Sequence, residues 1–193
     1  NILKTAKNII IINNQNNLGK GNSIKKGLDR ASSKNIILFD GDLEVSTSNI
    51  PSLIKDYENI YPNILAGSRW GDKPIPMNNI NNVGNFLINK IFNILFKSKI
   101  NDVLCCVKII KKDILKSINI ESGGFSVEVE IMSKVLLINQ TIFEKKIDYN
   151  RRSTKEGKKL KISNGWNIIF VMVQIFCKNI FKDKYFLSKK IIP

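Results

Sequence analysis

The first 70 residues alternate short apolar runs with segments of helical period. Lys7–Asn13 contains four consecutive isoleucines, and Ile36–Asp40 and Ile64–Gly67 are two further apolar runs bounded by polar residues. Such runs predict buried strands. Between them, Gly19–Ala31 and Pro51–Asn59 have the pattern of helices. The order strand-helix-strand-helix-strand predicts an α/β fold with a mostly parallel sheet flanked by helices.

The second half of the chain continues with further helix and strand signals. Residues 71–82 are rich in proline and asparagine and are expected to form a loop, and a basic loop is expected over Asn150–Lys161. A length of 193 residues suits one domain with a full hydrophobic core, expected over residues 1–162. The elements between the two loops are expected to be helix, strand, helix and strand, over Val83–Phe96, Val103–Ile110, Ser126–Ile138 and Thr141–Tyr149.

Residues 163–193 are expected to form an amphipathic helical tail. Trp166–Phe181 is apolar and shorter than the roughly 18–20 apolar residues that a membrane span requires. Such a helix lies on a membrane surface or packs on the sheet, and the sequence leaves both interpretations open. Three polar residues interrupt the apolar run: Asn167, Gln174 and Lys178.

The formal charge of +15 indicates anionic partners, which include nucleic acid, membranes and phosphorylated ligands. Nucleic acid is not expected, because the lysines are scattered and no aromatic residues interleave with a basic stripe. An arginine in this lysine-rich chain is a candidate for phosphate binding, since its planar guanidinium donates two parallel hydrogen bonds. The four arginines are Arg30, Arg69, Arg151 and Arg152.

The chain has three cysteines and no histidine, which excludes a Cys/His zinc site. The adjacent Cys105 and Cys106 lie in a strand-like run and are interpreted as small buried apolar residues. Unpaired cysteines of this kind favour a reducing compartment. We therefore expect a cytoplasmic protein.

The apolar run Ile36–Phe39 ends in Asp40-Gly41-Asp42. In open α/β sheets, ligands bind at the carboxyl ends of strands. Two carboxylates there suit a hard cation that also takes phosphate oxygens, such as Mg²⁺ or Mn²⁺. The pattern therefore indicates a nucleotide-diphosphate substrate, although aspartate and glycine also end strands in ordinary turns.

The segment Gly19-Lys20-Gly21 falls at a predicted strand-to-helix junction. Glycines at such a junction allow backbone N–H groups to approach a phosphate, and a helix N-terminus favours an anion. The spacing is not that of a Walker A loop. Gly19 and Lys20 are therefore candidate donor-binding residues, with a plain glycine turn as the alternative.

Taken in order, these motifs resemble those of family 2 glycosyltransferases, especially the dolichol-phosphate and polyprenyl-phosphate sugar transferases. The resemblance implies a GT-A fold, with inverting transfer of a sugar from a UDP- or GDP-sugar to a membrane polyprenyl phosphate. The ordered motifs are Asn17-Leu18-Gly19-Lys20-Gly21, Phe39-Asp40-Gly41-Asp42-Leu43-Glu44, Gly67-Ser68-Arg69, Gly84-Asn85, Asp102, Phe125-Ser126-Val127-Glu128-Val129-Glu130 and Tyr149-Asn150-Arg151-Arg152.

The resemblance also implies roles for individual residues. Asp40 and Asp42 would bind the metal and the donor diphosphate, and the metal, Mg²⁺ or Mn²⁺, would neutralise the leaving group. Asp42, Asp102 and Glu130 are the catalytic candidates. Glu128 and Glu130 are two positions apart on one helix and point in different directions, and the resemblance favours Glu130. The candidates for binding diphosphate or acceptor phosphate are Arg69, Arg151, Arg152, Lys158 and Lys159.

Two departures from the family pattern leave alternatives open. The opening strand, the Pro-X-X-Asn-Glu turn and the Asp-Asp-X-Ser strand end of the family do not occur, so we expect a fragment that lacks the first strand-helix unit and is inactive alone. Residues 78–82 carry no arginine, unlike related transferases. We expect a peripheral enzyme on the cytoplasmic face of a membrane. The alternatives are a saccharide acceptor, a non-catalytic relic, or a basic module that binds membrane or nucleic acid.

Overall fold

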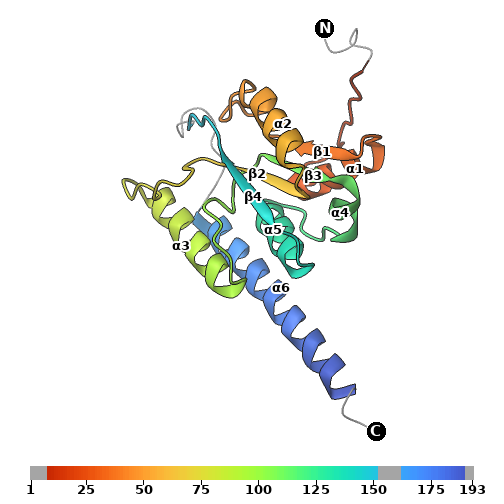
Figure 1. Ribbon diagram of the computed structural model, residues 1–193, viewed down its shortest axis with the longest axis vertical. Helices are drawn as coiled ribbons and strands as arrows, with labels where there is room; N and C mark the ends of the chain where they lie inside the picture. Colours follow the sequence, from red (N-terminus) through yellow and green to blue (C-terminus); the bar gives the residue numbers. More distant parts are fainter. Residues whose placement is uncertain (1–7, 152–161, 190–193) are drawn as a thin grey trace.

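The computed structural model describes residues 8–151 and 162–189 (Figure 1). It contains a four-stranded sheet with helices on both faces. The strands are β1 (Asn35–Leu38), β2 (Ile64–Ser68), β3 (Lys108–Lys111) and β4 (Ile142–Lys146). The helices are α1 (Lys20–Arg30), α2 (Asn49–Ile60), α3 (Ile80–Leu95), α4 (Lys112–Ser117), α5 (Val127–Leu137) and α6 (Ile162–Lys189).

The sheet is mixed, which corrects the predicted mostly parallel sheet. Its strand order is β1-β3-β2-β4. β3 is antiparallel to both β1 and β2, and only β2 and β4 pair in parallel. For β3 to run parallel to β2, the connection between them would have to carry the chain back to the end of the sheet where β2 begins. The connection through α3 instead returns the chain to the edge where β2 ends, so that β3 begins there and runs back.

The core lies on both faces of β2, in which all five residues are buried. On one face, Ile64 and Ala66 pack with Phe92 of α3 and Met172 of α6 in a core that α5 also joins. On the other face, Leu65 belongs to a smaller cluster that includes Leu53 and Tyr57 of α2. Figure 1 shows α2 on one side of the sheet and α3, α5 and α6 on the other.

The predicted strand over Lys7–Asn13 is wrong for the described residues, 8–13. They form no strand, and Ile9, Ile10, Ile11 and Ile12 are 48%, 71%, 54% and 41% exposed. Figure 1 shows this segment leaving the body of the domain beside α1. A run of isoleucines makes a buried strand only where a neighbouring strand and two covering layers are present, and in the described part of the chain this segment has neither.

α6 is part of the main core on one side and exposed on the other. Ile168, Met172 and Ile175 are buried, whereas Trp166 is 72% and Phe170 is 64% exposed. The helix packs along α3 and α5. The buried side of α6 agrees with the alternative of a packed helix, and a membrane contact of the outer face stays a prediction. Among the described residues, no helix has the length and apolar character needed to cross a bilayer.

Candidate functional site

The strand directions bring the ends of three strands to one edge of the sheet. Because β1 and β2 are both antiparallel to β3, they run in the same direction, and β4 runs parallel to β2. The residues that follow β1, β2 and β4 therefore meet at the edge where β3 begins. This edge receives Asp40 and Asp42 after β1, Arg69 after β2 and Tyr149 after β4.

Four charged side chains form a series of linked ion pairs at this edge. The Lys20 ammonium, at the first position of α1, lies 2.6 and 2.8 Å from the two carboxylate oxygens of Asp40. It also lies 2.5 Å from Oε1 of Glu128, in the first turn of α5. The other oxygen of Glu128 accepts a hydrogen bond from Lys108, which is fully buried at the start of β3. The charges alternate in sign along Lys108, Glu128, Lys20 and Asp40.

The neighbours of Glu128 and Lys20 keep both groups ionised. Burial alone would raise the pKa of Glu128, but the ammonium groups of Lys108 and Lys20 hold this pKa below its usual value. Burial would likewise lower the pKa of Lys20, but Glu128 and Asp40 hold it above its usual value. A buried ion pair is retained only when such partners compensate the cost of removing the charges from water.

Asp42 lies in the turn that follows Asp40. Its Oδ1 accepts a hydrogen bond from the Glu44 N–H at 3.1 Å, and Leu43 in this turn has a left-handed φ of 65°. Both aspartates are partly exposed. Carboxylate oxygens are the ligands that Mg²⁺ and Mn²⁺ prefer, so the two aspartates are suitable ligands for such an ion.

The described residues contain no cluster of three or more His, Cys, Asp or Glu side chains that could bind a metal. An ion bound by Asp40 and Asp42 would therefore need oxygens from another molecule. Mg²⁺ is commonly bound in this way, through one or two carboxylates together with substrate phosphates. The donor set fits an ion that arrives with a diphosphate.

Arg69 forms a second, separate ion pair. Its Nε and Nη2 each donate to a carboxylate oxygen of Asp102 at 2.7 Å, and its backbone N–H donates to the same carboxylate at 2.9 Å. Asp102 is only 1% exposed. The guanidinium also stacks over Trp70 at 4.3 Å and lies 5.4 Å from the Tyr149 ring centroid. Asp102, predicted as a catalytic residue, thus lies where it orients Arg69.

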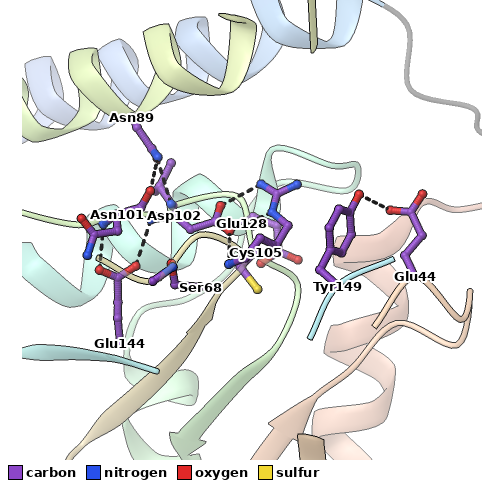
Figure 2. Close-up of polar contacts among 12 residues, drawn as sticks. Glu44, Ser68, Asn89, Asn101, Asp102, Cys105, Glu128, Glu144 and Tyr149 are labelled. Carbon is purple, nitrogen blue, oxygen red and sulfur yellow. Dashed lines mark hydrogen bonds and ion pairs between the residues drawn. The ribbon is translucent and has the colours of Figure 1, made fainter. Parts of the chain in front are cut away.

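Glu144 of β4 supports the Arg69–Asp102 pair by binding the backbone of the loop that carries Asp102. The backbone N–H groups of Asn101 and Asp102 donate to the Glu144 carboxylate at 2.7 and 2.9 Å (Figure 2). Asn89 of α3 accepts a hydrogen bond from the Val103 N–H at 2.9 Å. Hydrogen bonds to β4 and α3 therefore hold the loop that carries Asp102.

We expect Asp102→Asn to lower the free energy of unfolding by about 3 kcal/mol, because a nearly buried guanidinium loses its charged partner. Urea denaturation of the full-length protein measures this change. Asp56→Asn is the matched control, since Asp56 forms a more exposed pair with Lys145 at 2.9 Å, and exposed pairs contribute at most about 1 kcal/mol. Equal losses in the two variants would contradict the buried-pair interpretation.

The loops after β1 and β4 are tied to each other. The Tyr149 hydroxyl donates to the Glu44 carboxylate at 2.7 Å (Figure 2). The Asn150 N–H donates to the Glu44 carbonyl at 2.7 Å, and Val45 and Tyr149 form an isolated antiparallel bridge. Burial and the hydrogen bond to Glu44 raise the pKa of Tyr149 to about 12.

Arg151 lies after this bridge and contacts the start of α3. Its Nη1 donates to Asn79 at 2.8 Å, and Asn79 also accepts the Asn82 N–H as the N-cap of α3. The other basic residues predicted for phosphate binding, Arg152, Lys158 and Lys159, lie outside the described residues.

The glycines of the Gly19-Lys20-Gly21 segment have a packing role. The Gly21 N–H donates to the Gly123 carbonyl at 2.8 Å, and the Gly19 N–H donates to Asn17 Oδ1 at 3.0 Å. A Cβ at Gly19 would lie 2.3 Å from the Gly123 oxygen, and Gly19 has φ +82°. These contacts do not support a phosphate cradle at Gly19. The glycines instead allow the start of α1 to pack against the loop before α5.

The two glutamates of α5 have different partners. Glu130 accepts the N–H groups of Glu121 and Ser122 at 2.7 Å each and binds Lys134 at 2.6 Å. It therefore braces the loop before α5. Glu128 binds Lys20, so Glu128 rather than Glu130 lies beside the Lys20–Asp40 pair, and a catalytic role for Glu130 stays a prediction. A lysine in an apolar strand, Lys108, was the overlooked signal, because such a lysine needs a buried carboxylate partner.

The sequence pattern of glycosyl transferase family 2 matches residues 1–118, which are more than half of the chain. The chain belongs to glycosyl transferase family 2. An uncharacterised protein of Methanocaldococcus jannaschii is 32% identical over 134 residues, or 65% of this chain and 58% of that protein. Glycosyltransferase AglJ of Haloferax volcanii is 24% identical over 61% of this chain and 39% of its own length.

Dodecaprenyl-phosphate galacturonate synthase of Rhizobium johnstonii is 29% identical over 57% of this chain and 32% of its own length. This family 2 chain therefore matches less than two thirds of each of these three relatives. Among solved structures, glucosyl-3-phosphoglycerate synthase of Mycobacterium tuberculosis with Mn²⁺, UDP and phosphoglyceric acid has a TM-score of 0.62 at 14% identity. The match covers 82% of this chain and 54% of that one. It confirms the predicted GT-A fold.

Proposed function

We propose that the chain is the donor-binding part of an inverting glycosyltransferase. It moves a sugar from a UDP- or GDP-sugar to a polyprenyl phosphate. The observation that supports this function most strongly is the convergence of Lys20, Asp40 and Asp42 at one sheet edge in a family 2 fold. Two carboxylates and a lysine at this position match the charges of a metal-bound diphosphate.

In the proposed reaction, an oxygen of the acceptor phosphate forms a bond to the anomeric carbon of the sugar. The bond between that carbon and the donor diphosphate breaks, and the electron pair stays on the diphosphate. A metal ion held by Asp40 and Asp42 would neutralise this leaving group. Lys20 contributes a further positive charge next to it. An acceptor phosphate is already anionic at neutral pH, so no strong general base is required.

The acceptor assignment rests on three observations. A relative is named dodecaprenyl-phosphate galacturonate synthase. Arg69, held by Asp102, presents a fixed guanidinium at the strand ends and is assigned to the acceptor phosphate. The outer face of α6 exposes Trp166 and Phe170, residues that favour a membrane interface. We propose that the reaction takes place at a membrane surface, on its cytoplasmic side.

The test uses the full-length protein, vesicles that contain polyprenyl phosphate, and UDP- and GDP-sugars labelled in the sugar. We expect label in the organic extract, with release of the nucleoside diphosphate, only when Mg²⁺ or Mn²⁺ is present. Vesicles with polyprenol that lacks the phosphate are the control. Label in a water-soluble saccharide would show that the acceptor is a saccharide and not a polyprenyl phosphate. No turnover, together with salt-sensitive binding to vesicles or nucleic acid, would favour a non-catalytic basic module.

A further inference from the structure

The Lys20 ammonium contacts two carboxylates inside the site. An ammonium has three N–H donors, and Nζ lies within 2.8 Å of both oxygens of Asp40 and of one oxygen of Glu128. The Lys20 side chain is 17% exposed and the Asp40 side chain is 33% exposed. Both oxygens of the first aspartate in the Asp-X-Asp motif are thus already engaged by a cation that belongs to the protein.

A divalent ion bound by Asp40 would compete with this ammonium. Mg²⁺ needs a carboxylate oxygen at about 2.0–2.1 Å, and two cations sharing one carboxylate repel each other strongly at such distances. The ion and the Lys20 ammonium therefore favour different arrangements of the same carboxylate.

The backbone around Lys20 is closely packed, so we expect its side chain rather than its backbone to move. Gly21 donates to Gly123, and neither Gly19 nor Gly21 has room for a Cβ. Glu128 is held on its other oxygen by Lys108. When Lys20 leaves Asp40, Glu128 still holds it beside the place where the diphosphate of the proposed donor would bind.

We propose that Lys20 is a built-in counter-cation that occupies Asp40 until the metal ion and the donor diphosphate arrive together. The inference rests on the proposed function and extends it. The metal displaces the Lys20 ammonium from Asp40, and the displaced ammonium pairs with the diphosphate. Metal binding without nucleotide is therefore weak. Metal and nucleoside diphosphate strengthen each other's binding by the same factor, as linkage requires.

The test is a Mn²⁺ titration of the full-length protein, in which electron paramagnetic resonance reports free Mn²⁺, with and without UDP or GDP. Without nucleotide, we expect Lys20→Met to bind Mn²⁺ at least about tenfold more tightly than the wild type, because the competing charge is gone. With Mn²⁺ present, the same variant should bind the nucleoside diphosphate about tenfold more weakly. Lys25→Met, on the same helix, is the matched control and should match the wild type in both titrations.

A double-mutant cycle with Asp40→Asn identifies the carboxylate, because the gain from Lys20→Met should vanish when Asp40 is already neutral. Thermal melts followed by circular dichroism verify that each variant is folded. Unchanged or weaker Mn²⁺ binding by Lys20→Met would overturn the competition while leaving the proposed transferase intact. If neither the wild type nor Lys20→Met bound Mn²⁺ even with UDP or GDP, the metal-dependent transferase would fail as well.

Discussion

Gly21→Ala is expected to lower the free energy of unfolding by about 3 kcal/mol or more, a large part of the stability of an ordinary domain. The added Cβ would lie 1.8 Å from the carbonyl oxygen of Ser122 and 2.9 Å from its carbonyl carbon. These are backbone atoms, which cannot rotate away as the end of a side chain can. The loop before α5 would have to move, and the hydrogen bond from the Gly21 N–H to Gly123 would break.

Gly27→Ala is the matched control, since Gly27 is on the same helix and a Cβ there would meet nothing within 4 Å. Alanine is the better helix former, so this variant should gain about 0.5–1 kcal/mol. Urea denaturation followed by circular dichroism measures both changes. A Gly21→Ala protein as stable as the wild type would show that the α1 start does not pack against the 122–124 loop.

Asp42→Asn is expected to lower kcat/KM for sugar transfer about a thousandfold in the full-length protein. A metal ion contributes several kcal/mol of charge stabilisation, and every 1.36 kcal/mol corresponds to a factor of ten in rate. Asparagine retains an oxygen that accepts the Glu44 N–H, which Asp42 accepts at 3.1 Å. The turn is thus preserved, and the loss isolates the charge.

The rate is measured against Mn²⁺ concentration, and part of the loss should be recovered at high Mn²⁺. Asp29→Asn is the control, because Asp29 is an exposed carboxylate of α1 and should leave the rate unchanged. Near-normal transfer by Asp42→Asn would remove Asp42 from the metal site.

Local patterns were sufficient to predict most of the helices and strands. Ile36–Asp40 and Ile64–Gly67 closely match β1 and β2, because short apolar runs between polar residues have few other uses in a domain of this size. Lys7–Asn13 has the same pattern and forms no strand among its described residues. A strand is defined by its neighbours, and no apolar pattern specifies those.

No local pattern could predict the direction of β3 either, because this direction depends on where the connection through α3 returns the chain. The same connection brings Lys108 into contact with Glu128. For a related reason, no local pattern could show that Glu128, rather than Glu130, contacts Lys20. Helical spacing shows that the two α5 glutamates point apart, but the partner of each is set by the loops around it. Asp40 and Asp42 could be predicted as a candidate site because ligands in α/β sheets bind at strand ends, and the family resemblance added Arg69; their roles stay predictions.

The hydrogen bond between Gly21 and Gly123 also limits how sequences of this kind can diverge. It joins the first turn of α1, which carries Lys20, to the loop before α5. Glu128, the partner of Lys20, is in the first turn of α5. A homologue with a larger residue at the position of Gly21 must therefore reshape the segment equivalent to 122–124 at the same time. The small residue and the loop are expected to change together in evolution wherever the Lys20–Glu128 ion pair is retained.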